Sequence, residues 1–280
     1  MHTIAKIHEL DDLDIHPELI EQLKEIRGLL DRKKYKELFI ATKDEVVTGI
    51  AISWLNDFHP TAKYIRFFAV ESMPTLLEAV LQPVEAQDKI VFSCWEDEHE
   101  KITMVENCGF QLFRQTYMAA FPVEVLLAKL KNIETAASIK SLEQILLNDK
   151  EAFFTMLKTN YEQTHTDNPA QSYTWQEWGS ILLDDEVDAE LSGAFIEEEQ
   201  IKAYIMLHPV TNTHYEIGWI GQSEQEGIQA LFKWQLLSLQ QKGIQSVEIE
   251  VDTTDWHAMK LFSFLNLQEI KSWNSYMLSR

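Results

Sequence analysis

The sequence predicts two related α/β domains in tandem, each with a mixed, mostly antiparallel sheet flanked by helices. One order of elements occurs twice, about 155 residues apart. In the first copy fifteen residues separate Cys94 from Gly109, and in the second the same number separate Val251 from Asn266. Each copy also has an upstream hairpin with a charged turn, at 39–51 and 194–206. A repeat of this length is a whole domain rather than a solenoid unit.

The chain length and composition suit this organisation. The 280 residues are ample for two domains of roughly 100 to 150 residues, and 45% hydrophobic content is enough for two cores. No run approaches the roughly 18 apolar residues of a membrane span, and the acidic start is unlike a signal peptide, so we expect a cytoplasmic protein without a membrane partner. Cys94 and Cys108 have neither disulfide nor metal-ligand spacing, which predicts buried, reduced thiols and no metal.

The formal net charge is −21 at pH 7. This charge argues against a nucleic-acid partner, because phosphate binding needs a basic surface. An acidic field concentrates cationic small molecules or basic proteins. The alternative is that the charge only keeps the protein soluble.

The first domain is predicted at residues 1–125. Pro17 suits the first turn of a helix, and Gly109 is placed to end one. The hydrophobic pattern predicts strands at 3–8, 38–42, 46–55, 64–70 and 89–95, helices at 17–31, 74–81 and 97–107, and a closing strand pair at 110–121.

The second domain is predicted at residues 133–280. The junction at 122–133 contains an amphipathic stretch, 125–130, that we expect to be helical. The remaining pattern predicts strands at 135–139, 215–221, 246–251 and 276–278, a hairpin at 189–208, and helices at 149–163, 175–183, 227–242 and 255–266.

The strand 215–221, the turn 222–226 and the helix that opens at Gly227 resemble the GCN5-related N-acetyltransferase superfamily, in a tandem arrangement. In that family this turn and helix N-terminus hold the diphosphate of coenzyme A through backbone N–H groups. The family's R/Q-x-x-G-x-G/A reads Glu224, Gly227 and Gln229 here, so one position in three matches. Glu224 and Glu226 would each cost about 2 kcal/mol beside a diphosphate before screening. The alternative is an ordinary strand-turn-helix connection.

A second family pattern, N-x-x-A-x-x-L-Y-x-x-x-G-F, corresponds to the helix that follows Asp255. Ala258 and Leu261 match it directly, and Asn266 is a substitute for glycine at a left-handed helix end. Phe262 stands where the family often has a tyrosine that protonates the departing thiolate, and a phenyl ring has no proton to give. Another group or water must then supply that proton. The resemblance implies acetyl-CoA as cosubstrate, bound by Trp219, Ile220, Gly221, Gln222, Gln225, Gly227, Ile228, Asp255, Ala258 and Phe262.

A carboxylate is the expected general base, because the acceptor amine must lose a proton before it attacks the thioester. Glu216 is the first candidate and Glu250 the second. Strand alternation places Glu216 and Gly218 on one face and Ile217 and Trp219 on the other. The resemblance implies that a main-chain N–H around Trp219 or Ile220 holds the developing oxyanion. The alternative for Glu216 is a solvated strand-end carboxylate.

The expected acceptor is a primary amine on a small molecule or peptide, and a cationic acceptor is one option. The resemblance places its pocket in the first two helices of the second copy and the loop between them, at 161–183. The aromatic candidates there are Tyr161, Tyr173, Trp175 and Trp178, with Glu162, Asp167 and Glu177 as partners for a cation. Alternatively, the aromatics fill the core and the acids face water. His165, His208 and His257 have no metal or triad spacing and are expected to be surface or satisfied histidines.

The first copy departs further from the family pattern. Its 64–70 strand runs into Glu71-Ser72-Met73-Pro74 without a glycine, and Val105 stands at the position of Phe262. Pro74 also removes an N–H donor. We therefore predict that the first copy does not bind coenzyme A.

The leading hypothesis is an N-acetyltransferase whose activity lies in the second domain. The main alternative is a non-catalytic relative used for binding or regulation. Transfer of another acyl group, or of an amino acid from a carrier, is a third option, because a fold does not fix the chemistry.

Overall fold

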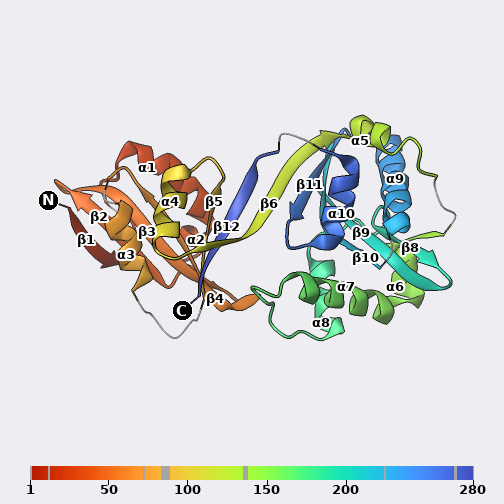
Figure 1. Ribbon diagram of the computed structural model, residues 1–280, viewed down its shortest axis with the longest axis horizontal. Helices are drawn as coiled ribbons and strands as arrows, with labels where there is room; N and C mark the ends of the chain where they lie inside the picture. Colours follow the sequence, from red (N-terminus) through yellow and green to blue (C-terminus); the bar gives the residue numbers. More distant parts are fainter. Residues whose placement is uncertain are drawn as a thin grey trace. The chain divides into compact units, whose positions relative to one another are not determined.

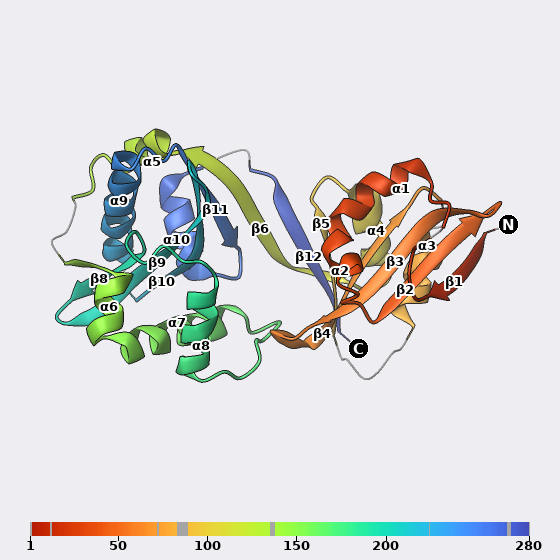
Figure 2. The same ribbon diagram turned by 180° about the vertical axis from the view of Figure 1, so that it is seen from behind.

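The computed structural model describes residues 2–11, 13–71, 73–82, 89–134, 138–223, 225–267 and 270–279. The chain divides into two compact units (Figures 1 and 2). The first unit comprises Met1–Phe113, Asn168–Gln171 and Asn274–Arg280. The second comprises Arg114–Asp167 and Ser172–Trp273.

The first unit is built on a mixed sheet with strand order β1-β2-β3-β4-β5-β12. Neighbouring strands from β1 to β4 are antiparallel, and β4 and β5 are parallel. The strands are β1 (Thr3–Ile7), β2 (Glu37–Lys43), β3 (Val46–Asn56), β4 (His59–Ala69), β5 (Lys89–Trp95) and β12 (Ser272–Ser279).

Helices pack on both faces of the first sheet. The buried side chains of α3 and α4, including Leu76 and Val105, share one core cluster with Phe67 and Phe92. Leu19 of α1 and Ile26 of η1 belong to a second cluster on the opposite face. These helical elements are α1 (Pro17–Gln22), the 3-10 helix η1 (Leu23–Ile26), α2 (Arg27–Asp31), α3 (Met73–Leu81) and α4 (His99–Asn107).

The second unit repeats this plan, with strand order β6-β11-β10-β9-β8-β7. Strands β10 and β11 are parallel, and the other paired neighbours are antiparallel. The strands are β6 (Gln111–Pro122), β7 (Ile139–Ser141), β8 (Gly193–Glu197), β9 (Gln200–Thr211), β10 (His214–Gln222) and β11 (Ser246–Asp252).

The core of the second unit lies between its sheet and three helices, α5, α9 and α10. Leu126, Leu231 and Leu261 from these helices pack with Ile217 and Ile249 of the sheet. Helices α7 and α8 cover part of the other face, where Phe153 of α7 contacts Tyr204 edge to face. The helices are α5 (Val123–Lys129), α6 (Leu142–Asn148), α7 (Lys150–Thr164), α8 (Trp175–Asp184), α9 (Gln225–Gln241) and α10 (Trp256–Leu265).

The predicted fold class, with two similar α/β sheets flanked by helices, is confirmed. Three element predictions were wrong. The expected strand pair at 110–121 is the single strand β6, the expected helix at 17–31 is interrupted by η1, and α6 was not predicted. Of the strand expected at 135–139, residues 135–137 lie outside the described residues, and β7 begins at Ile139. Cys94 is buried as predicted, but Cys108 is exposed, because it caps the end of α4 at the surface.

The compact units differ from the predicted boundaries because each copy gives its last strand to the sheet of the other copy. Strand β6 follows the first copy in sequence, yet it pairs with β11 from Thr116 to Pro122. The end of β12 belongs to the first unit, where Ser275 hydrogen-bonds Ser93 and Tyr276 joins the core. A fragment that begins at residue 133 would lack β6, so the full chain is the appropriate material for experiments.

Helix α10 ends in a left-handed backbone conformation, whose effect on stability can be tested by substitution. Asn266 caps this helix in the left-handed region, with φ of 46°, as the sequence predicted for the position of a family glycine. We expect Asn266→Ala to lower the unfolding free energy by about 1 kcal/mol, and Asn266→Gly to be neutral or stabilising. Denaturant unfolding of both variants checks this, and equal stability of the two would contradict it.

Candidate functional site

Strands β10 and β11 diverge in the middle of the second sheet. Their parallel pairing ends at Ile217 and Ile249. Both strands continue beyond this point, β10 to Gln222 and β11 to Asp252. The two strands therefore leave a gap, whose edges are the backbones of the unpaired strand ends.

A β-bulge in β10 lies at the point where the gap opens. The pairing of β10 with β9 shifts register between Ile217 and Trp219, so Gly218 is the extra residue. The predicted alternation is wrong after the bulge: the Trp219 indole lies 5.5 Å from the Tyr161 ring and donates to Asp185, on the face that carries Glu216. A bulge adds one residue to one strand, and every later side chain then changes face.

The backbone of β10 offers hydrogen-bond donors to this gap. The N–H of Gln222 donates to Nδ1 of His257 over 3.3 Å, so it points away from β9. N–H groups two residues apart along a strand point the same way, which directs the N–H of Ile220 to the side from which β11 has diverged. The strand pairing provides no partner for it there. The Gln222 amide also donates to the His257 carbonyl over 2.8 Å and closes the far end of the gap.

Three glutamates lie on the sheet face opposite the main core. Glu216 and Glu248 are register partners on β10 and β11, and Glu250 lies one step further along β11, past the last paired residue. Burial raises the pKa of Glu216 above its ordinary value, and Glu248 adds to the rise. Adjacent strands are only about 4.8 Å apart, which explains why the carboxylates affect each other.

Glu250 has the more strongly shifted pKa of the two predicted base candidates. Its side chain is exposed to solvent in part, yet the surrounding protein raises its pKa to about 7, with smaller contributions from Asp252 and Glu216. A carboxyl group with this pKa accepts and releases protons near neutral pH, as a general base requires.

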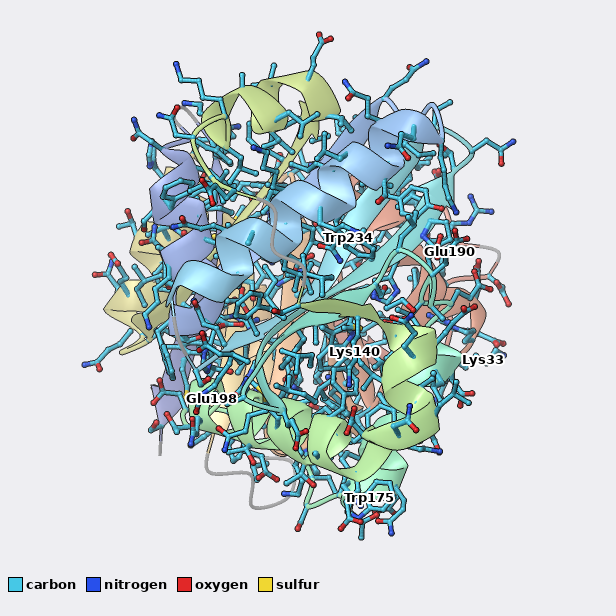
Figure 3. All side chains as sticks on the ribbon, turned by 90° about the vertical axis from the view of Figure 1, so that its right-hand side faces the viewer. Lys33, Lys140, Trp175, Glu190, Glu198 and Trp234 are labelled. Carbon is cyan, nitrogen blue, oxygen red and sulfur yellow. The ribbon has the colours of Figure 1, made fainter. Side chains whose placement is uncertain are left out.

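The predicted aromatic residues of α7 and α8 do not all line one surface. Tyr161, Tyr173 and Trp219 each contact Trp178, which is fully buried. Trp175 is half-buried at the start of α8, at the outer edge of the second unit (Figure 3). Of the predicted acidic partners, Glu177 is engaged in the capping box of α8, Glu162 pairs with Lys158, and Asp167 lies in the loop after α7.

The predicted diphosphate turn leads from β10 into α9. Gly227 and Ile228 are buried in the first turn of α9. A Cβ on Gly227 would come within 2.4 Å of the Phe195 ring, so close packing of α9 against β8 requires glycine here. Gln225 begins the helix, Gly221 and Ile220 are buried at the end of β10, and Glu224 lies outside the described residues.

Helix α10 carries the other predicted coenzyme residues. Asp255 caps the helix by accepting from the N–H groups of His257 and Ala258, and Ala258 is buried. Burial raises the pKa of Asp255 to about 6. Phe262 is half-buried and stacks on Tyr117 of β6, with ring centroids 5.3 Å apart. Sequence reasoning missed the Gln222–His257 contact and Tyr117, because both depend on which elements meet in space.

The corresponding gap in the first unit is bridged by a side chain. Pairing of β4 and β5 ends at Ile65 and Phe92, and the next residues are Arg66 and Ser93. Arg66 donates from its guanidinium to the Ser93 carbonyl. Burial lowers the pKa of Arg66 to about 10, so it remains charged at neutral pH. Strand β4 has regular pairing with β3 from Lys63 to Ala69, so it lacks the bulge seen in β10.

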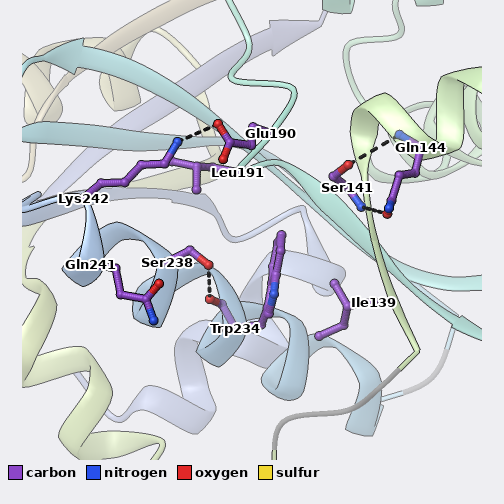
Figure 4. A pocket seen from close by; sticks show the side chains of 9 residues that line it. All are labelled: Ile139, Ser141, Gln144, Glu190, Leu191, Trp234, Ser238, Gln241 and Lys242. Carbon is purple, nitrogen blue, oxygen red and sulfur yellow. Dashed lines mark hydrogen bonds and ion pairs between the residues drawn. The ribbon is translucent and has the colours of Figure 1, made fainter.

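A pocket of about 440 Å³ lies elsewhere in the second unit (Figure 4). The Trp234 side chain stands at its centre, and the ion pair between Lys242 and Glu190 forms one side. Trp234 and Leu191 pack with the core on the α9 side of the sheet, whereas Glu216 and Glu250 lie on the other face. This pocket is therefore separate from the gap and its carboxylates.

Solved structures share this fold. A GCN5-related N-acetyltransferase from Sphaerobacter thermophilus is similar over 93% of this chain and 85% of its own, with a TM-score of 0.63 and 16% identity. A tandem GNAT protein from the clavulanic acid biosynthesis pathway is similar over 100% and 98%, with a TM-score of 0.54 and 8% identity. A GNAT-family acetyltransferase from Colwellia psychrerythraea is similar over 99% and 100%, with a TM-score of 0.52 and 12% identity.

The chain thus has the fold of the GCN5-related N-acetyltransferase superfamily, in a tandem arrangement. No family model matches the sequence, and no curated protein matches it. Within the described residues, no helix is long and apolar enough to cross a membrane.

Proposed function

We propose that the second unit is an acetyl-CoA-dependent N-acetyltransferase that transfers an acetyl group to a primary amine. The observation that carries this proposal is the bulged, unpaired end of β10 facing the diverging β11, with Glu250 at its edge. The fold of the acetyltransferase neighbours supports acyl transfer as the reaction type.

The residues around the gap fit a coenzyme A thioester. The N–H of Ile220 is directed to the gap, and the N-terminus of the 17-residue helix α9 adds donors and a positive dipole end. Gly227 lets α9 approach β8 closely, and Phe262 presents an apolar ring for a pantetheine arm. The cosubstrate supplies the activated acyl carbon when it is bound.

Glu250 acts as the general base in this proposal. A primary amine with a pKa of about 10.4 is almost fully protonated at neutral pH. Glu250 accepts one proton from it, and the free lone pair attacks the thioester carbon. The C–N bond forms as the C–S bond breaks, a second proton leaves the nitrogen for solvent, and the thiolate takes a proton from water, since Phe262 has none to give.

We further propose that Glu216 holds the cationic amine near the bulge. Burial and the neighbouring Glu248 already raise the pKa of Glu216, so a bound cation would relieve this repulsion. The exposed part of Trp219, which packs beside Tyr161, offers an aromatic surface to the same cation, whereas the Tyr161 ring is stacked on His165. The cytoplasmic location and the lack of nucleic-acid and membrane partners stay predictions from the sequence.

The specific observation that favours a non-catalytic binding protein is Phe262. It occupies the helix position from which a tyrosine would protonate the thiolate, and Asp255, about two turns earlier, is already used as the cap of the same helix. In this second candidate the gap binds a coenzyme or acyl carrier without turnover.

Thiol release from acetyl-CoA with a panel of primary amines separates the two candidates. We expect turnover whose kcat/KM rises with pH through about 7, because Glu250 must be deprotonated to act as a base. Binding of coenzyme without acetylation of any monoamine, diamine or lysine peptide would favour the non-catalytic candidate.

A further inference from the structure

His208 of β9 has a fixed tautomer. Its Nδ1 lies 2.7 Å from the backbone carbonyl of Asp185. A carbonyl oxygen only accepts, so Nδ1 carries the hydrogen and the neutral ring has a bare lone pair at Nε2. The Asp185 carboxylate lies 3.8 Å from the same Nδ1.

The other edge of the His208 ring lies against the bulge. A Cβ on Gly218 would be 2.5 Å from Nε2 and 2.7 Å from Cδ2 of His208, closer than any real contact of this kind. The His208 side chain is only 12% exposed, and Nε2 is buried with no hydrogen-bond partner among the described residues. Gly218 is the extra residue of the bulge, and because it has no side chain it leaves room for the His208 ring above it.

Asp185 connects both strands that flank the bulge. Its carbonyl holds His208 on β9, and its carboxylate accepts from the Trp219 indole of β10 over 3.5 Å. Glu216 is the register partner of His208, so the charged groups that face the ring are Glu216 and Asp185, with Glu248 and His214 beside Glu216.

We infer that His208 is a positioning residue for acyl transfer: held by Asp185, its ring covers Gly218 and keeps the bulge in the shape that directs the Ile220 N–H into the gap. The inference rests on the proposed function of this gap. A buried polar atom without a partner destabilises the folded state, yet the fold keeps Nε2 of His208 at this position rather than an apolar side chain.

The tautomer is tested without any activity measurement. Nitrogen-15 NMR of the His208 imidazole in the full-length protein should show hydrogen on Nδ1 and a bare Nε2 at pH 8. In His208→Ala, the amide resonances of Gly218, Trp219 and Ile220 should shift, while those of residues 246–249, in the paired part of β11, should move little. Hydrogen on Nε2, or unchanged amides at the bulge, would overturn the inference.

A double-mutant cycle tests the contact with Gly218 in turnover. We expect His208→Ala and Gly218→Ala each to lower kcat at least tenfold with little change in KM. The double variant should be no slower than Gly218→Ala alone, because the collision requires the ring. His208→Asn, which keeps a donor for the Asp185 carbonyl, should recover part of kcat. Additive losses, or wild-type kcat in His208→Ala, would overturn the inference.

His214 provides the matched control. It is also a histidine on the second sheet. It begins β10, where it bonds the Ser246 hydroxyl at the start of β11 and lies 3.4 Å from the Glu248 carboxylate, and it precedes the bulge by four residues. His214→Ala should leave kcat within about twofold of wild type. If no amine is acetylated by the wild-type protein, the proposed function fails, whereas the NMR measurements still decide the placement of His208.

Discussion

Replacing Glu250 with glutamine should lower kcat for acetyl transfer by about 10²- to 10⁴-fold, the usual contribution of a general base. The amide keeps the size and shape of the side chain but accepts no proton. Because the pKa of Glu250 is raised to about 7, the wild-type rate should rise with pH through this value, and the variant should lose that rise. Steady-state kinetics between pH 5.5 and 9 checks both effects.

The same substitution should raise the stability of the protein at alkaline pH, although it lowers the rate. The folded-state pKa of Glu250 lies above its ordinary value of 4.5, so ionisation opposes folding. The wild-type protein should therefore lose stability as pH rises from about 4.5 to about 7, and Glu250→Gln should be more stable at pH 8 and unchanged at pH 4.5. The gain is on the order of 1 kcal/mol, because the side chain is partly exposed and solvent screens the effect.

Glu248→Gln is the control on the same strand and face. Glu248 lies in the paired part of β11, and its carboxylate lies 3.4 Å from Nε2 of His214, so its loss should change kcat no more than a few-fold. If Glu250→Gln keeps the wild-type rate and pH dependence, Glu250 is not the base, and Glu216→Gln then becomes the decisive variant.

Replacing Gly227 with aspartate should abolish coenzyme binding and also destabilise the second unit. The new Cβ would lie 2.4 Å from the Phe195 ring, so α9 or β8 must move. Overpacking of this kind costs about 1–3 kcal/mol. A displaced helix N-terminus no longer presents its N–H groups to the diphosphate, and the added carboxylate repels it. Thermal unfolding and acetyl-CoA titration measure the two effects.

Gln229→Asp separates the effect of the added negative charge from the effect of the steric clash with the Phe195 ring. Gln229 is half-buried in the first turns of α9, so the variant adds the same charge without entering the Phe195 contact. It should weaken acetyl-CoA binding less than Gly227→Asp and leave the unfolding temperature nearly unchanged. Wild-type affinity in Gly227→Asp would show that the turn into α9 does not hold the coenzyme.

The repeated order of strands and helices was enough to predict the fold of each copy. Hydrophobic periodicity and helix-ending residues such as Gly109 and Asn266 depend on local sequence, and both residues have the positive φ that their positions require. The exchange of β6 and β12 between the sheets was not predictable, because a strand pattern does not specify its neighbours. Val251 pairs with Tyr117, 134 residues earlier in the chain, through backbone groups that every residue type carries.

The candidate site was only partly predictable for the same reason. Glu216 and Glu250 were found from the chemistry that acyl transfer needs, but their pKa shifts arise from neighbours on other strands. The bulge at Gly218 has no sequence signal beyond a glycine in a strand. The bridging of the first gap by Arg66 and the contact of His208 with Gly218 depend on side chains that meet across strands.

Calorimetric titration of the full-length protein with acetyl-CoA tests the central claim, which is that the gap of the second unit is open to a thioester and that of the first is closed. We expect one micromolar site per chain, lost in Gly227→Asp. Arg66→Ala should add no second site, because β4 of the first unit also lacks the bulge that β10 has in the second unit. Two sites per chain, a site that survives Gly227→Asp with full affinity, or no binding at millimolar coenzyme would contradict the account.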